Sequence, residues 1–238
     1  MIKRKMESLT VLIPAHNEER LIGNTLPHIL NYLKSLKVDF EIIVCINSST
    51  DKTEQIVSSF SKKDKRVKYL LIKEKGFGIA VRKGIKSAKK NVIVYMPADN
   101  EVDKSFIGMA LKQIKDYDVV SGSRYLDKDY LLEDLFRDFL SRAYAKITRA
   151  FISNKITECG TVKMYKSKWA KEFVEYCTRD GWDFQLEELY LALKHKKKIV
   201  EIPIKVNEQN ERQSKVHVVS TTLSLLKSVM KYWIKLRV

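Results

Sequence analysis

The sequence predicts an α/β protein in which a mostly parallel sheet is flanked by helices, with amphipathic helices toward its C-terminal end. Short apolar runs alternate with segments of helical period along the first half of the chain, a pattern typical of βαβ units. Two longer segments in the second half carry apolar and basic side chains on different faces. The chain has 238 residues, of which 45% are hydrophobic. We therefore expect residues 1–238 to form a single domain.

The predicted strands are short apolar runs, and the inner ones are nearly continuous in apolar side chains, as buried parallel strands are. These strands are Leu9–Pro14, Phe40–Ile46, Val67–Ile72, Val92–Met96 and Asp118–Ser121. The predicted helices between them are Glu19–Leu36, Lys52–Phe60, Gly76–Lys89 and Lys104–Lys115. Crossovers of this kind are right-handed, so the strands run in one direction, and ligands bind beyond their carboxyl ends.

The second half predicts one further strand, Val200–Ile204, and two amphipathic helices, Leu131–Ile152 and Ser220–Arg237. Each helix places apolar residues along one side and basic residues along another. Two interpretations stay open for this pair. The helices pack on the core, or they dock on an anionic membrane surface.

Charge and cysteine content limit the partners and the compartment. The net charge is +16, which attracts polyanions such as nucleic acid, acidic lipid headgroups or phosphorylated substrates. No interleaved aromatic and basic platform is present, so nucleic acid is not an expected partner. Cys45, Cys159 and Cys177 lack CxxC spacing and predict free thiols in a reducing compartment. Met1–Glu7 is mostly charged and does not resemble a signal peptide. We therefore expect a cytoplasmic protein, peripheral at the cytoplasmic face of the membrane.

Polar motifs follow the predicted strands in a characteristic order. They are VLIPAHNEE (11–19), INSSTDKT (46–53), KGFGIAVRKGI (75–85), YMPADNE (95–101) and DVVSGSRY (118–125), followed by DFQLEELYLALK (183–194) and RQSK (212–215). This series resembles the family 2 glycosyltransferases, which have the Rossmann-like GT-A fold. Its later part is similar to the dolichyl- or polyprenyl-phosphate mannose synthase branch. The resemblance spans nearly the whole chain.

The resemblance implies a donor site for a nucleotide sugar, linked to GDP or UDP, in about residues 1–125. The implied donor-binding residues are Pro14, Ala15, Asn17, Glu18, Asn47, Lys75, Gly76, Ala98 and Asp99. Asn17 and Glu18 taken alone also fit a helix cap and a first-turn carboxylate.

The same resemblance implies a divalent cation, Mg²⁺ or Mn²⁺, that offsets the charge of the departing diphosphate. Asp99 matches the second carboxylate of the family motif, and Glu101 matches a later ligand. Pro97 stands in place of the first carboxylate and has no side-chain ligand atom. The alternative is an acidic loop that binds no metal.

An acceptor-binding half is expected from about residue 126 onward. The resemblance implies that Arg124, Arg137 and Ser141 clasp the phosphate of a lipid carrier, a task that suits the fixed fork of arginine donors. It also implies that a loop with Arg212, Ser214 and Lys215 closes over the site. An ionised phosphate attacks without a general base, whereas a hydroxyl acceptor requires one.

The candidate catalytic residues are Asp99, Arg124 and Glu187, with Glu187 as a base or donor contact, or simply as a favourable helix start. The predicted function is inverting transfer of a hexose from GDP-mannose or a UDP-sugar to a polyprenyl or dolichyl phosphate. Two alternatives stay open: transfer to a glycan hydroxyl, and a nucleotide-sugar-binding protein of weakened activity. The sequence leaves the sugar and the oligomeric state open.

Overall fold

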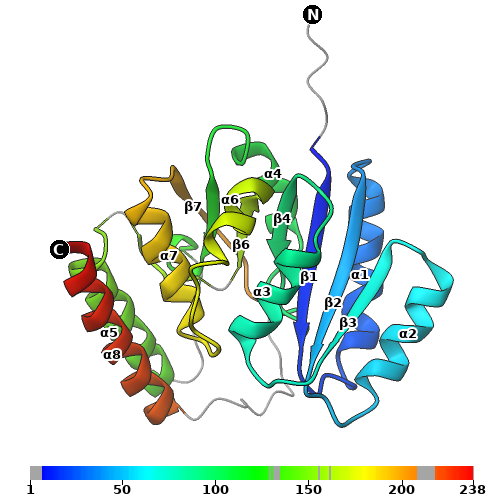
Figure 1. The fold of residues 1–238 in the computed structure, drawn as a ribbon, viewed down its shortest axis with the longest axis horizontal. Coiled ribbons are helices and arrows are strands. Elements are labelled where there is room, and N and C mark those ends of the chain that lie inside the picture. The colour runs from blue at the N-terminus through cyan, green and yellow to red at the C-terminus, as the bar shows by residue number, and fades with distance from the viewer. Residues whose placement is uncertain are drawn as a thin grey trace, which may run out of the picture.

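A computed structural model describes residues 7–128, 130, 135–154, 156–160, 162–207 and 218–237, without the side chains of 135–138 and 218–224. In these residues the chain forms one sheet of seven strands in the order β3-β2-β1-β4-β6-β5-β7 (Figure 1). The strands are β1 (Leu9–Ala15), β2 (Phe40–Asn47), β3 (Val67–Ile72), β4 (Val92–Tyr95), β5 (Val119–Ser123), β6 (Lys163–Lys166) and β7 (Ile199–Pro203).

The sheet is parallel except at β6. Strand β1 pairs in parallel with β2 and β4, β2 with β3, and β5 with β7. Strand β6 lies between β4 and β5 and is antiparallel to both. The mostly parallel sheet is confirmed, and the sequence did not predict β6. Because β6 runs the opposite way, its first residue lies at the edge where the other strands end.

Helices cover both faces of the sheet, as predicted. On one face lie α1 (Ile22–Ser35), α2 (Thr53–Lys63) and α4 (Ser105–Gln113). On the other lie α3 (Phe77–Ser87), α6 (Ser167–Phe173) and α7 (Phe184–Lys194). Side chains of β1 alternate between the two cores, with Val11 and Ile13 in the first and Leu12 in the second.

The two amphipathic helices are α5 (Leu135–Phe151) and α8 (Val218–Arg237), which lie side by side at the edge of the molecule (Figure 1). The rings of Phe151 and Trp233 meet edge to face, with centroids 5.4 Å apart. A buried Tyr232 joins α8 to the core beneath α7. Within the described part of the chain, no helix is both long and apolar enough to cross a lipid bilayer.

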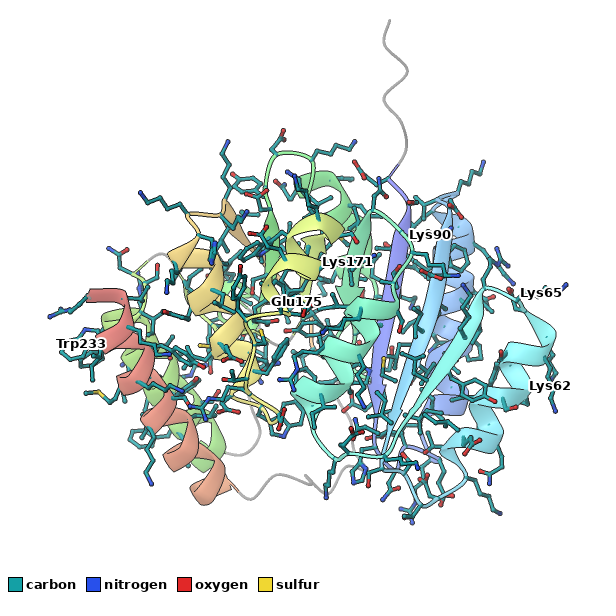
Figure 2. All side chains as sticks on the ribbon, viewed as in Figure 1. Lys62, Lys65, Lys90, Lys171, Glu175 and Trp233 are labelled. Atoms are coloured by element: carbon teal, nitrogen blue, oxygen red, sulfur yellow. The ribbon has the colours of Figure 1, made fainter. Side chains whose placement is uncertain are left out.

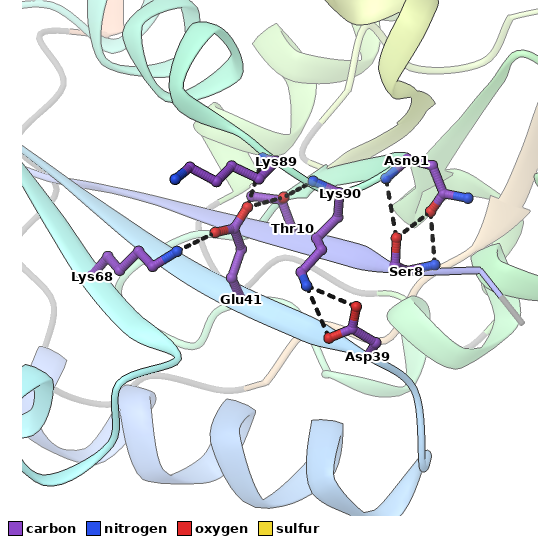
Figure 3. A network of polar contacts seen from close by, with 8 residues as sticks. All are labelled: Ser8, Thr10, Asp39, Glu41, Lys68, Lys89, Lys90 and Asn91. Atoms are coloured by element: carbon purple, nitrogen blue, oxygen red, sulfur yellow. Dashed lines mark hydrogen bonds and ion pairs between the residues drawn. The ribbon is translucent and has the colours of Figure 1, made fainter.

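A polar network closes the amino-terminal edge of the sheet, away from the strand ends that the motifs follow (Figure 3). At its centre is the buried carboxylate of Glu41, which pairs in register with Thr10. Glu41 accepts hydrogen bonds from Thr10 Oγ1 at 2.8 Å, Lys68 Nζ at 2.7 Å and the Lys89 backbone N–H at 2.7 Å. These contacts join β1, β2, β3 and the end of α3.

We predict that Glu41→Ala lowers the free energy of unfolding by about 2–3 kcal/mol at neutral pH, because it leaves buried donors without their acceptor. Burial acts to raise the pKa of Glu41, but its hydrogen-bond donors outweigh burial and hold this pKa below its ordinary value. The Glu41 carboxylate therefore stabilises the protein fully at pH values above the ordinary glutamate pKa. This stabilisation is lost as the pH falls through the lowered pKa of Glu41 in the folded protein. Urea denaturation across this pH range measures it.

The matched control is Asp39→Ala, which removes an exposed carboxylate from the same network, where it pairs with Lys90 at 2.7 Å. This variant should change stability by no more than about 0.5 kcal/mol, because exposed ion pairs contribute little. Equal losses of unfolding free energy in the two variants would refute the proposed role of Glu41. A loss in Glu41→Ala that persists in acid would also refute it.

Candidate active site

Three turns at the carboxyl ends of neighbouring strands contain non-glycine residues in the left-handed region. They are Asn17 after β1, Ser48 after β2 and Asn100 after β4, with φ of 54°, 50° and 59°. Such backbone is sparsely populated outside glycine and persists only where neighbouring contacts hold it. All three turns lie at one edge of the sheet, because the three strands are parallel.

The turns after β1 and β2 are joined by hydrogen bonds. Asn17 Oδ1 accepts the Thr50 backbone N–H at 2.8 Å, and the Asn17 N–H donates to Ser49 Oγ at 3.0 Å. His16 Nδ1 lies 2.8 Å from the carbonyl oxygen of Asn47. The predicted donor residues Asn17 and Asn47 therefore lie in one connected loop structure.

A second set of contacts links the following residues. The Glu18 N–H donates to Thr53 Oγ1 at 2.8 Å, and the Glu19 N–H donates to Asp51 Oδ2 at 3.0 Å. Asp51 Oδ1 also accepts the Thr53 N–H at 3.0 Å. Burial acts to raise the pKa of Asp51, but these donors hold it below its ordinary value. The sequence prediction omitted Ser49, Asp51 and Thr53 as site residues, although they lie in the quoted INSSTDKT segment.

The predicted donor residues at the end of β1 and before α3 lie at the same edge. Pro14 and Ala15 are the last residues of β1, and Lys75 and Gly76 directly precede α3. Gly76 has φ of 156°, and a Cβ there would lie 2.4 Å from the Asp180 carbonyl oxygen. Glycine is required at this position, because the backbone of Asp180 approaches it closely.

The acidic loop after β4 is held by a segment from the far end of the chain. Asp99 is 5% exposed, and its Oδ1 accepts the Glu101 N–H at 3.0 Å. Asn207 Nδ2 donates to the Asn100 carbonyl oxygen at 2.7 Å, and the Asn207 N–H donates to that of Glu101 at 2.8 Å. Ala98, predicted at the donor site, is buried beside Asp99. Asn207 had no local signal that marked it in the sequence.

The acidic loop contributes two carboxylates, those of Asp99 and Glu101. No group of three or more His, Cys, Asp or Glu side chains suitable for a metal occurs among the residues with described positions. Magnesium is commonly bound through one or two protein carboxylates together with substrate phosphates. The donor set fits that mode of binding.

Strand β6 brings the second half of the chain to this edge. Its first residue, Lys163, pairs with Tyr95 of β4 on one side and Ser121 of β5 on the other. The ends of β4 and β5 are therefore separated by one intervening strand, about 10 Å. Arg124 follows β5 directly, so it lies across β6 from the acidic loop.

Arg124 is held by a carboxylate that the sequence did not identify. Its Nε donates to Glu158 Oε1 at 2.8 Å, its Nη2 lies 2.7 Å from the same atom, and its backbone N–H donates to Glu158 Oε2 at 2.8 Å. Burial alone would lower the pKa of Arg124, but the Glu158 carboxylate raises it. The guanidinium is therefore firmly charged.

Aromatic residues connect Arg124 to α5. The Arg124 guanidinium carbon lies 5.8 Å and 5.5 Å from the ring centroids of Tyr125 and Tyr130. The Tyr125 hydroxyl is 2.6 Å from Ser141 Oγ. Burial raises the pKa of Tyr130 to about 12, with Arg124 opposing the rise. The structure therefore brings together Arg124 and Ser141, two of the three predicted acceptor residues.

Four predicted side chains have no described position. Arg137 belongs to α5, but its side chain lies outside the described residues. Arg212, Ser214 and Lys215 of the predicted closing loop also lie outside them. The roles of these residues stay predictions.

Glu187 has a structural task in α7. Its carboxylate accepts the Thr178 N–H and Oγ1 at 2.9 Å each, the Arg179 N–H at 2.8 Å and the Tyr232 hydroxyl at 2.9 Å. These bonds tie the start of α7 to residues 178–179 and to α8. A carboxylate with four donors is poorly suited to accept a substrate proton, and a catalytic role for Glu187 stays a prediction.

The neighbouring Glu188 forms a buried ion pair beneath the site. Lys163 Nζ lies 2.7 Å from Glu188 Oε1, and the side chains are 2% and 1% exposed. The hydroxyls of Tyr95 and Tyr165 donate to Glu188 at 2.9 Å and 2.5 Å. The pair thus fixes α7 against β4 and β6, since breaking a buried pair leaves an uncompensated charge.

A profile of the family described as Glycosyl transferase family 2 matches residues 10–174, more than half of the chain. The chain belongs to this family. The predictions of a glycosyltransferase and of the GT-A fold are thereby confirmed.

This family 2 glycosyltransferase is 29% identical over 219 residues to the dolichyl-phosphate beta-glucosyltransferase of Drosophila melanogaster, covering 84% of this chain and 67% of that protein. It is 27% identical over 241 residues to the protein of the same name from Dictyostelium discoideum, covering 94% and 73%. A crystal structure of glucosyl-3-phosphoglycerate synthase from Mycobacterium tuberculosis with Mn²⁺, UDP and phosphoglyceric acid matches with a TM-score of 0.67. That match, at 13% identity over 95% of this chain and 78% of that chain, shows the fold alone.

Proposed function

We propose that this glycosyltransferase moves a hexose from a nucleoside-diphosphate sugar to a polyprenyl or dolichyl phosphate. The observation that carries the proposal is the placement of a charged arginine, Arg124, at the strand edge that also bears the acidic loop and the paired turns. The similarity to two dolichyl-phosphate glucosyltransferases supports it. In this proposal about residues 1–125 bind the donor and about residues 126–238 bind the acceptor.

The donor is a UDP- or GDP-linked hexose, and UDP-glucose is the first to test. The relatives are named glucosyltransferases, and the synthase of the same fold was crystallised with UDP. We assign nucleoside binding to Pro14, Ala15, Asn17, Glu18 and Asn47. Lys75, Gly76 and Ala98 complete the donor site, with the exposed Lys75 facing the phosphates.

Asp99 and Glu101 would hold a divalent cation, Mg²⁺ or Mn²⁺. Structures of the same fold contain Mn²⁺ or Mg²⁺ with UDP. When bound, such a cation offsets the negative charge that accumulates on the departing diphosphate. Hard cations prefer the carboxylate oxygens that these two residues provide. Pro97 leaves the site with fewer carboxylates than the family motif.

The transfer step follows from an ionised acceptor. An oxygen of the acceptor phosphate forms a bond to the anomeric carbon while the bond from that carbon to the diphosphate oxygen breaks. The electron pair leaves with the nucleoside diphosphate, and the configuration inverts. Arg124, with Ser141 and Arg137, orients the acceptor phosphate. No proton has to be removed from the nucleophile.

A hydroxyl acceptor is the second candidate, and it requires a carboxylate base. The best sequence candidate for that base, Glu187, already accepts four hydrogen bonds. This observation favours the phosphate acceptor.

Helices α5 and α8 support a membrane-bound acceptor. Their exposed apolar side chains include Phe139 at 67% and Ile234 at 54%. Exposed basic residues accompany them: Arg142, Lys146, Arg149, Lys227, Lys231 and Lys235. This combination suits an anionic interface. The cytoplasmic leaflet carries the negative surface potential that attracts such helices, and we place the protein there as a peripheral protein.

We predict that the protein converts UDP-glucose or another nucleotide hexose and a short polyprenyl phosphate into a glycosyl-phosphoryl-polyprenol in the presence of Mn²⁺. Asp99→Asn should lower this turnover by about a hundredfold, because charge compensation of the leaving group contributes several kcal/mol. Mass spectrometry of the lipid product measures turnover by the unchanged protein and by Asp99→Asn.

Asp116→Asn, an exposed substitution before β5, is the matched control and should leave turnover unchanged. Transfer to glycan hydroxyls with none to the lipid phosphate would contradict the proposed acceptor. Full metal-dependent turnover in Asp99→Asn would contradict the ligand assignment.

For membrane binding we predict that replacing Lys227, Lys231 and Lys235 by Gln weakens co-sedimentation with anionic liposomes by about a hundredfold, at about 1 kcal/mol per lysine. The control replaces Lys62, Lys63 and Lys65, which are also exposed. Figure 2 shows Lys62 and Lys65 at the opposite edge of the molecule from Trp233 of α8. Equal effects of the two triple variants would show that net charge, and not this surface, determines binding.

A further inference from the structure

Arg124 binds a phosphate best if its side chain is already held in one orientation. An arginine side chain has several rotatable bonds, and fixing them costs conformational entropy at the moment of binding unless the protein has already done so. In this structure Glu158 binds Arg124 twice. One carboxylate oxygen accepts a hydrogen bond from Nε and lies 2.7 Å from Nη2, and the other accepts the backbone N–H.

Glu158 is itself held from β7. Glu201 accepts the Thr157 N–H at 2.7 Å, Thr157 Oγ1 at 2.8 Å and the Glu158 N–H at 3.1 Å. Thr157 Oγ1 also lies 2.7 Å from Ser123 Oγ, at the end of β5. The segment before β6 is thus fixed on both sides, to β7 and to β5.

The Glu158 carboxylate uses only one edge of the Arg124 guanidinium. Glu158 occupies the Nε and Nη2 side, and the rings of Tyr125 and Tyr130 lie within 6 Å of the guanidinium carbon. Among the residues whose side chains are described, none makes a hydrogen bond or ion pair with Nη1 of Arg124. A phosphate oxygen that approaches Nη1 would accept a charge-assisted hydrogen bond from the guanidinium.

We infer that Glu158 and Glu201 are positioning residues: Glu201 fixes the 157–158 segment, and Glu158 fixes the side chain of Arg124 in the orientation that receives the acceptor phosphate. The identity of that ligand rests on the proposed function. The orientation of Arg124 does not depend on the proposed function.

A competing interpretation is that Glu158 occupies the phosphate position until the acceptor displaces it. The geometry opposes this interpretation. Glu158 Oε2 accepts the backbone N–H of Arg124, and its departure would leave that donor without its partner, at a site where Glu158 is 7% exposed. Unpaired buried donors are costly, so Glu158 stays in place when the ligand binds.

The test compares Glu158→Gln and Glu201→Gln with the unchanged protein. Glu158→Gln should raise the KM for a short polyprenyl phosphate about tenfold, the loss of one charge-assisted contact. Glu201→Gln should raise the same KM about threefold, since Glu201 acts on Arg124 only through Glu158. The dissociation constant for UDP should change little in both.

A second readout does not depend on turnover. The Nε–H resonance of Arg124, assigned by its loss in Arg124→Lys, should be protected from solvent exchange in the unchanged protein and lose that protection in both variants. Glu175→Gln removes an exposed carboxylate on the segment after α6 (Figure 2) and should change neither the KM nor the resonance.

Several results would overturn the inference. An unchanged acceptor KM with an unchanged resonance would show that Glu158 does not orient Arg124. A lower KM in Glu158→Gln would show that Glu158 competes with the phosphate. If the unchanged protein fails to glycosylate any polyprenyl phosphate, the proposed function is wrong, while the resonance still decides whether the two glutamates position Arg124.

Discussion

The site depends on the coincidence of strand ends at one edge of the sheet. Strands β1, β2 and β4 are parallel, so their following turns meet there, and each turn uses a left-handed residue that neighbouring contacts hold in place. The turns after β1 and β2 stabilise one another through backbone and side-chain hydrogen bonds. The rigid sheet holds the polar loops that follow its strands, and these loops form the ligand-binding edge.

The antiparallel strand β6 adds the second half of the chain to that edge. Its reversed direction places the segment before it, with Glu158, between the ends of β4 and β5. The same reversal buries Lys163 under the site, where Glu188 neutralises it. The reversed direction of β6 therefore brings Arg124 near the acidic loop. Through the Lys163–Glu188 pair it also anchors α7 beneath the site.

The first half of the fold could be predicted because its apolar runs and helical periods are long and local. Strand β6 could not, since KMYK has a lysine at each end and only two residues between. Glu158, Glu201 and Asn207 act through contacts between segments far apart in sequence, which local pattern does not encode. Glu187 had the right type and position for catalysis, and its four hydrogen bonds became visible only in three dimensions.

The most direct measurement is an experimental structure of the protein with UDP and Mn²⁺. We predict nucleotide density across the ends of β1, β2 and β4, with the nucleoside beside Asn47 and the diphosphate and metal beside Asp99. Nucleotide bound elsewhere on the surface, with that edge vacant, would contradict the view that the converging strand ends form the donor site.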